Sequence, residues 1–379
     1  MKFFKVFFKM IWVLILILAV LILIFINDNR KISNIETIVS GYKYSIIRWE
    51  LNNFPDKWIN KFKYLQNTSS DIGITALCDY LETNEGDQNY VEEVLESLVS
   101  NVLVEEEFAR LGTFVFPPVD TKLKSAPNLL VISPRNRIER IQEILLSSEI
   151  SLSIIEDIEN KLLLEEDLSG LVIELGGLAT YPSSIADIQS LEYILTTVAH
   201  EWVHHYLFFH SLGKAIYTDE EMTILNESIS TIIGNEIGTK VWTKISNNEN
   251  CRSQPKEQKE NTSFNFSDVM KKTRQMVEKY LQDGQIEEAE IYMDNQRKEF
   301  VRNGYSIRKI NQAYFSFYGT YADRPESVSP IYKYLLEIRN EFSSLREFLD
   351  LLEDVSSYEE FLKIYEDIVT KNNNIDNTE

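Results

Sequence analysis

The stretch TVAHEWVHHY, residues 197–206, contains two histidines four residues apart, with a glutamate directly after the first. On an α-helix, residues four apart lie one above the other on the same face. His200 and His204 could therefore bind one metal ion together, with Glu201 turned about 100° from His200 around the helix. A carboxylate placed there can reach the water that such an ion would hold. The stretch therefore predicts a metal-binding helix.

The surrounding sequence predicts that this helix runs from about residue 186 to residue 211. Residues 182–184 (PSS) offer a start and Gly213 offers a stop. The chain has only four histidines, so a chance occurrence of HExxH is rare. The alternative is that these histidines are ordinary members of a buried helix. Apolar residues recur at spacings of three and four, as on a helix with one buried face; they are Leu191, Ile194, Leu195, Val198, Trp202 and Tyr206.

A catalytic zinc site usually has three protein ligands and one position for water. Residues 224–238 (ILNESISTIIGNEIG) predict a second helix, which residues 218–221 (TDEE) open as a capping box. Its polar side carries small residues, so that another helix can approach it closely. Glu227 lies on this side and is the third ligand that we favour.

His210 is the rival third ligand, because it follows His204 by six residues, as in HExxHxxGxxH proteases. Those proteases turn the chain sharply at a glycine, and that position is Leu207 here. Without the turn, the helix carries His210 about 240° around from His204. We therefore favour Glu227. His205 is interpreted as a residue that supports a ligand or lines the cleft.

These residues together resemble the gluzincin branch of the zinc peptidases, in which HExxH is joined by a glutamate from a following helix. The chain is also similar to proteins described as membrane-associated zinc aminopeptidases of bacteria, closely over about residues 170–240 and loosely over 300–350. Thr231 departs from the pattern, because some gluzincins have an aspartate there as the partner of a ligating histidine. The stretches that carry the resemblance are residues 176–183, 197–206, 225–231 and 310–321.

The resemblance implies a mostly α (α+β) fold, namely a zincin-like helical body with a small antiparallel sheet. It also implies that His200, His204 and Glu227 bind Zn²⁺ and that Glu201 acts as the general base. In gluzincins, a strand before the metal helix often pairs with the substrate backbone. Gly177, Leu178 and Ala179 could do so here, although a plain turn into the helix is the alternative.

A group of tyrosines late in the chain is the candidate donor to the oxyanion of a tetrahedral intermediate. Tyr314, Tyr318 and Tyr321 fall on one helical face together with Asn311. We expect Tyr318 or Tyr321 to take the catalytic role and Tyr314 to contact substrate. The alternative is an aromatic core stripe. Arg324 is expected either to bind a substrate carboxylate or to pair with an acidic side chain.

Residues 10–26 form an unbroken apolar run, about 26 Å long as a helix. Residues 1–31 are therefore expected to be a transmembrane anchor. A cleaved signal peptide is the alternative, but no small-residue cleavage site follows the run. Basic residues flank the run on both sides, with a slight excess before it. This predicts a single-pass membrane protein with a cytoplasmic N-terminus and an extracytoplasmic catalytic body.

The remaining sequence predicts one peptidase body over residues 32–370 and a disordered polar tail over residues 371–379. Within the body we expect a metal-site core at about 128–245, a mobile loop at 246–266 and a helical part at 268–370. The expected elements outside the metal helices are a helix at 91–112, a strand at 128–134, a helix at 135–146 and a strand that begins at 171.

The formal net charge of −21 argues against nucleic acid as a partner. Cys78 and Cys251 are the only cysteines. They could form one disulfide in an oxidising compartment, and free thiols are the alternative.

The expected function is thus zinc-dependent hydrolysis of peptide or protein substrates. Aminopeptidase specificity would rest on resemblance alone, with Glu174 as the candidate to bind a free amine. Three alternatives remain open: a zinc-binding scaffold without activity, a zinc hydrolase of non-peptide amides or esters, and a helical binding module without a metal.

Overall fold

The computed structural model describes residues 34–53, 70–187, 190–216, 218–246, 251 and 264–376. The chain divides into two compact units, Met1–Gly41 and Tyr42–Glu379. The described part of the first unit contains the short helix α2 (Asn34–Val39). All candidate site residues belong to the second unit.

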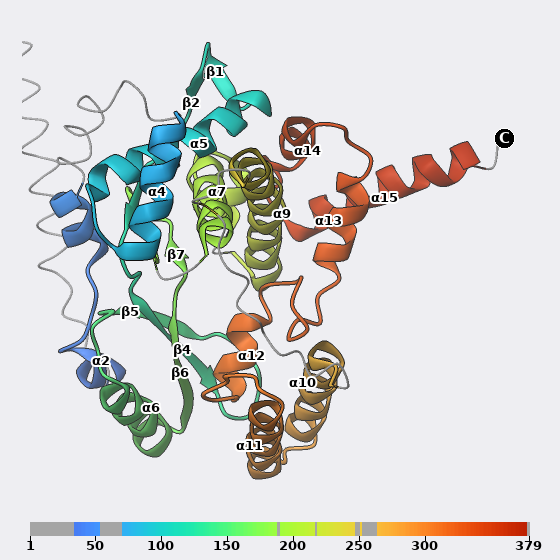
Figure 1. Ribbon diagram of the computed structural model, residues 1–379. Helices are drawn as coiled ribbons and strands as arrows, with labels where there is room; N and C mark the ends of the chain where they lie inside the picture. Colours follow the sequence, from blue (N-terminus) through green and yellow to red (C-terminus); the bar gives the residue numbers. More distant parts are fainter. Residues whose placement is uncertain are drawn as a thin grey trace, which may run out of the picture. The chain divides into compact units, whose positions relative to one another are not determined.

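Helices make up most of the second unit (Figure 1). They are α4 (Asp71–Thr83), α5 (Gln88–Glu105), α6 (Leu152–Glu166), α7 (Leu191–Leu207), α8 (Ser211–Ala215), α9 (Glu220–Ile245), α10 (Phe266–Gln282), α11 (Ile286–Arg302), α12 (Gln312–Tyr318), α13 (Ile331–Arg339), α14 (Leu345–Leu352) and α15 (Tyr358–Asp376).

Among the described residues of this unit, the strands form three small sheets. The first is a two-stranded antiparallel sheet of β1 (Ala109–Leu111) and β2 (Phe114–Val115). In the second, β4 (Asn128–Pro134) lies between β5 (Gln142–Leu146) and β6 (Leu168–Glu174), antiparallel to both. In the third, β8 (Ser183–Ile185) is parallel to β3 (Thr121–Leu123) and antiparallel to β7 (Gly177–Leu178). The strand β7 thus lies at an edge of its sheet.

The helices α7 and α9 run side by side at the centre of the larger hydrophobic core (Figure 1). The side chain of Ser190 accepts a hydrogen bond from Tyr193 N and caps α7. Asp219 caps α9 in the same way, accepting from Met222 N. The predicted helices are therefore confirmed, although α7 is shorter than expected and the cap of α9 is Asp219. Both caps are polar residues directly before an apolar periodic segment, which is the usual signal for a helix start.

A second hydrophobic core joins β4 and β6 to α10, α11 and α12. The strand β4 is buried over nearly its whole length and has the bounds that the sequence predicts. The strand β6 contains the predicted start at residue 171 but begins three residues earlier. The segment 268–370 is helical throughout its main elements, as predicted.

The fold class is mostly helical, as expected, but two of its details need correction. The described residues form three small sheets instead of one antiparallel sheet, and one of the three is mixed. The predicted anchor at residues 1–31 lies outside the described residues. Across the parts of the chain that the structure describes, none of the helices has both the length and the apolar character needed to cross a membrane. This finding contradicts the transmembrane helix in the expected fold class and the expected single-pass membrane localisation.

Three local predictions also differ from the structure. Residues 135–146 do not form a helix, because the segment returns as β5 and pairs with β4. The helix predicted for residues 91–112 ends at Glu105, and the residues after it enter β1. The helix α15 continues to Asp376, into the segment expected to be a disordered tail. The expected mobile loop at 246–266 lies mostly outside the described residues.

Cys78 and Cys251 form a disulfide, with Cα atoms 5.1 Å apart. It links α4 to the segment that follows α9. Of the two alternatives that the sequence leaves open for the cysteines, the structure contains the disulfide.

Candidate metal centre

Three predicted ligand atoms converge between α7 and α9. His200 Nε2 and His204 Nε2 lie 3.0 Å apart. Glu227 Oε2 is 3.4 Å from His200 Nε2, and Glu227 Oε1 is 3.6 Å from His204 Nε2. Bonds of about 2.0–2.1 Å in tetrahedral geometry separate two ligand atoms by about 3.4 Å. These three residues could therefore hold one metal ion.

Two glycines of α9 allow this convergence. A Cβ atom added to Gly234 would lie 3.0 Å from the Cα atom of His200. At Gly238 an added Cβ atom would lie 2.6 Å from Thr196 Cα. The two helix backbones are thus closer than larger side chains would permit, and Glu227 can reach both histidines. The predicted small-residue side of α9 does face the metal helix.

Asn226 orients His204. Its Oδ1 atom lies 2.8 Å from His204 Nδ1, and the Ser230 hydroxyl lies 3.4 Å from the same nitrogen. Because the Oδ1 atom can only accept, the proton of a neutral imidazole is held on Nδ1, and Nε2 keeps its lone pair for an ion. Asn226 is 1% exposed, so few other partners can reach it. Asn226 is therefore a hydrogen-bond partner of a candidate histidine ligand, the role for which some gluzincins have an aspartate at the position of Thr231.

Glu201 lies directly against the edge strand β7. A Cβ atom added to Gly177 would lie 2.5 Å from Glu201 Oε1 and 2.7 Å from Thr197 Cγ2. Only glycine fits at this contact without a shift of its neighbours. The structure therefore brings two predicted features together, the base and the candidate substrate strand. Burial raises the pKa of the Glu201 carboxyl above its usual value.

His205 is not in the ligand group and supports the chain that follows β7. Its Nε2 atom lies 2.9 Å from the carbonyl oxygen of Thr180, and its ring lies 5.5 Å from the ring of Tyr181. Burial lowers the pKa of His205 to about 4, so the ring is neutral at pH 7. A neutral imidazole with Nε2 protonated donates to this carbonyl and fixes the loop beside Ala179.

Within the ligand group, the charges of the histidines and Glu227 shift one another's pKa values. Burial opposes a charge on His204, but the Glu227 carboxylate outweighs burial and raises the pKa of His204 to about 9. Burial alone would raise the pKa of Glu227, whereas the two histidines hold it well below its usual value. The carboxylate therefore stays ionised, as a metal ligand must.

The three candidate tyrosines are separated by the structure. Tyr321 lies in the turn after α12 and is close enough to Glu227 and Glu201 to interact with both; its pKa is raised well above the usual value, first by burial and then by these carboxylates. Tyr314 is 6% exposed and its hydroxyl donates to the buried Glu326 carboxylate at 2.8 Å. Tyr314 thus belongs to the core, as the alternative interpretation expected. Tyr318 packs on Tyr314 with ring centroids 4.6 Å apart.

Two residues near the ligands were missed by the sequence reasoning. No role was expected for Asn226, although its position directly before Glu227 on the same helix was a usable signal. Asp323 interacts electrostatically with His200, and burial raises its pKa. Nothing in the sequence around Asp323 indicated that the turn after α12 would return to the metal helix.

His210 belongs to a different group. Its Nδ1 atom lies 3.4 Å from Glu353 Oε1 and 3.6 Å from Asp354 Oδ1. These three residues could also hold a metal ion. His210 caps α8, where the chain has already left α7, and its ring stacks on Tyr206. The structure thus brings Glu227 to the HExxH histidines and takes His210 elsewhere.

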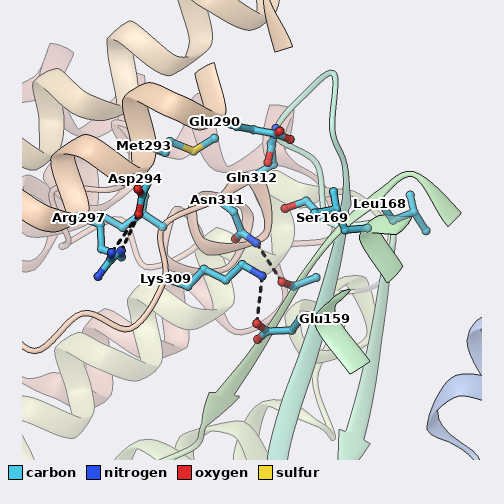
Figure 2. A pocket seen from close by; sticks show the side chains of 13 residues that line it. Glu159, Leu168, Ser169, Glu290, Met293, Asp294, Arg297, Lys309, Asn311 and Gln312 are labelled. Atoms are coloured by element: carbon cyan, nitrogen blue, oxygen red, sulfur yellow. Dashed lines mark hydrogen bonds and ion pairs between the residues drawn. The ribbon is translucent and has the colours of Figure 1, made fainter. Parts of the chain in front are cut away.

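A cavity of about 210 Å³ lies apart from these ligands, between α6, β6, α11 and the start of α12 (Figure 2). Four of its charged residues pair with one another: Lys309 with Glu159 at 3.0 Å, and Arg297 with Asp294 at 3.0 Å. Asn311 donates to the carbonyl oxygen of Gly170 at 2.9 Å and so links α12 to β6. No candidate site residue lines this cavity.

No protein-family model, curated protein or solved structure matches this chain, so the candidate site rests on its own residues and their geometry.

Proposed function

We propose that this protein is a zinc-dependent peptide hydrolase of the gluzincin type. The observation that carries the proposal is the convergence of His200, His204 and Glu227 with the carboxylate of Glu201 beside them. Two imidazoles and one carboxylate are the ligand set of many catalytic zinc sites. A bound zinc ion supplies Lewis-acid activation of water and of the scissile carbonyl.

Glu201 is the proposed general base. It accepts the proton of the attacking water and passes it to the nitrogen of the leaving amine. Its raised pKa favours this double role, because a base that must later act as an acid works best when its pKa lies near the working pH. Its carboxylate lies directly against Gly177, where a larger side chain would not fit.

The edge strand β7 is the proposed binding site for the substrate backbone. Within the described residues, β7 pairs with β8 on one side only. An extended peptide can add to the other side as a further strand, with hydrogen bonds from the main chain of Gly177, Leu178 and Ala179. This places a peptide bond next to Glu201, because Gly177 touches that carboxylate.

Tyr321 is the proposed donor to the oxyanion. Its closeness to Glu227 and Glu201 supports this role, and its raised pKa keeps the phenol protonated and able to donate. Tyr318 is the weaker candidate. It packs against Tyr314 and Arg324 and interacts with Glu326 and Tyr193, and among the described residues neither Glu201 nor Glu227 contributes to its electrostatics.

Hydrolysis of a mixed-sequence peptide library by the purified full chain tests the proposal. We expect cleavage that stops after treatment with a chelator and returns on addition of about one equivalent of zinc. A chain that binds zinc but cleaves no peptide would contradict peptidase activity and favour a scaffold. Cleavage of amide or ester compounds without cleavage of peptides would redirect the proposal to non-peptide substrates.

A further inference from the structure

We propose that Arg324 binds a carboxylate of the substrate and gives the site a preference for acidic peptides. The proposal rests on the function proposed above and names the class of substrate. The carboxylate is either an aspartate or glutamate side chain or the C-terminus of the peptide.

Arg324 is held in one orientation from two sides. Its Nε atom lies 3.4 Å from Glu326 Oε2. Its guanidinium carbon lies 4.5 Å from the centre of the Tyr318 ring, a stacking contact between the cation and the aromatic face. An arginine that is fixed in this way loses little further side-chain freedom when it binds a ligand.

Glu326 is a firm support for this orientation. Its side chain is 0% exposed, and its other oxygen accepts the hydroxyl proton of Tyr314 at 2.8 Å. Because a buried carboxylate needs a nearby positive charge, Arg324 cannot swing away from Glu326 without leaving that charge unpaired. The pair therefore fixes the guanidinium relative to α12.

The terminal nitrogens of Arg324 are available to a ligand. The side chain is 43% exposed. Neither Nη atom makes a hydrogen bond to any residue that the structure describes. Two parallel N–H donors on one edge of a guanidinium match the two oxygens of a carboxylate.

Arg324 is connected to the chain before β7 through two tyrosines. Its backbone N–H donates to the carbonyl oxygen of Tyr321 at 2.9 Å, within the turn that brings Tyr321 near Glu227. The Tyr318 ring beneath Arg324 interacts in turn with Tyr193. The Tyr193 hydroxyl lies within 2.7 Å of where a Cβ atom on Gly176 would be, just before β7. On this basis the proposed peptide along β7 presents its carboxylate to Arg324.

Arg324 provides a positive charge in a protein whose formal net charge is −21. The general field disfavours acidic ligands, so a preference for a carboxylate must come from a specific contact. Asp323, its neighbour in the chain, interacts with His200 and adds negative charge on the metal side. The two residues would therefore favour a peptide whose carboxylate lies on the Arg324 side and away from the metal.

The test uses peptides that differ at one position at a time, with glutamate, glutamine or lysine, each with a free or an amidated C-terminus. The ratio of kcat/KM for the glutamate and glutamine forms is measured for the full chain. We expect about a tenfold preference for glutamate, or for the free C-terminus, at one position. Arg324→Gln should abolish the preference, and Arg324→Lys, which keeps a positive charge beside Glu326, should keep part of it. The ratio of the two peptides is compared within each variant, so a general loss of activity cancels. Preference that persists with amidated peptides assigns the carboxylate to a side chain.

Arg302→Gln is the matched control, because Arg302 is an exposed arginine that pairs with Glu299 on α11. It should leave the preference unchanged. Equal rates for glutamate and glutamine, or a preference that survives in Arg324→Gln, would overturn the inference while leaving peptide hydrolysis intact.

A binding measurement separates this inference from the proposed function. Fluorescence anisotropy with the same peptides is measured on Glu201→Gln, which lacks the proposed base. About tenfold tighter binding of the glutamate form, lost when Arg324→Gln is added, supports Arg324 even if no peptide is cleaved. Equal affinities for the glutamate, glutamine and lysine peptides, with free and with amidated C-termini, would contradict the inference, whether or not the protein is a peptidase.

Discussion

The described part of the molecule contains two groups of histidine and acidic side chains that could hold a metal, but their surroundings differ. In the first group, Asn226 fixes the tautomer of His204, and Glu227 has no arginine partner among the described residues. In the second, Glu353 already accepts the Tyr206 hydroxyl at 2.5 Å and has Arg346 at 3.8 Å. Ligand atoms at suitable distances are thus not enough to make a metal centre.

The second group has two further disadvantages as a metal site. The side chain of Asp354 is 75% exposed, so water competes with it. Its two carboxylates, Glu353 and Asp354, would both be needed as ligands, so that neither is left to act as a general base as proposed for Glu201. Its geometry suits a structural link between the α7–α8 corner and the end of α14. The comparison predicts that metal binding and catalysis belong to the first group alone.

The largest expected effect is a difference in kcat between a variant of Glu201, beside the first group, and a variant of Glu353, in the second group. Glu201→Gln should lower kcat by about a thousandfold or more and leave zinc binding intact, because it removes the proton acceptor without removing a ligand. Glu353→Gln should leave kcat unchanged. Turnover and zinc content of both variants are the measurements. Near-normal turnover in Glu201→Gln would show that another group takes the proton.

The next effect concerns the partner of His204. Asn226→Ala should weaken zinc binding by about 10- to 100-fold, because the imidazole loses the acceptor that orients it. Asn226→Asp keeps an acceptor at the same place and serves as the matched control. Zinc affinity is measured by competition with a chromogenic chelator. Equal affinity in the alanine variant and the wild type would mean that Ser230 alone orients His204.

Zinc affinity should also depend on pH below about 9. Because the pKa of His204 is raised, a proton must leave its Nε2 atom before this atom can bind a metal. Affinity should therefore fall by about tenfold for each pH unit below that value. In the zinc-free protein the sign for stability is opposite. The Glu227 carboxylate stabilises protonated His204 in the folded protein. This contribution to the free energy of unfolding is complete below about pH 6.5 and is lost as the pH rises through about 9.

Titration of zinc binding between pH 6.5 and 9.5 measures the first effect, and urea unfolding of the zinc-free protein measures the second. His210→Ala should show the same two profiles, because His210 lies in the other group. An affinity that is independent of pH would contradict the electrostatic coupling of His204 to Glu227.

The smallest effect belongs to His210 itself. His210→Ala should lower the free energy of unfolding by about 1 kcal/mol, because it removes a partly buried pairing with Glu353 and a ring contact with Tyr206. Zinc content and turnover should stay at the wild-type level. Loss of activity in this variant, with the fold intact by circular dichroism, would tie the second group to the reaction.

The sequence predicted the centre of the site because its geometry is local. The spacing of His200 and His204 is set by the helix period, and the apolar stripe and the caps made the helices α7 and α9 predictable. Glu227 could be chosen over His210 because Leu207 replaces the glycine that a sharp turn would need. Each of these signals lies within a short window of the chain.

The parts that failed depend on partners far away in the sequence. Residues 142–146 carry a helical pattern, but pairing with β4 makes them a strand. Tyr321 and Asp323 reach the metal helix only because α12 ends at Tyr318 and the chain turns back. Of the two expectations for Arg324, the structure shows the pairing with an acidic side chain, Glu326, whereas binding of a substrate carboxylate is the proposal made above.

The most direct test of the central claim is the zinc content per chain of the purified protein, measured for the wild type, Glu227→Ala and His210→Ala. We predict about one zinc in the wild type and in His210→Ala, and loss of zinc in Glu227→Ala. Retention of zinc in Glu227→Ala together with its loss in His210→Ala would contradict the account and move the metal centre to the second group.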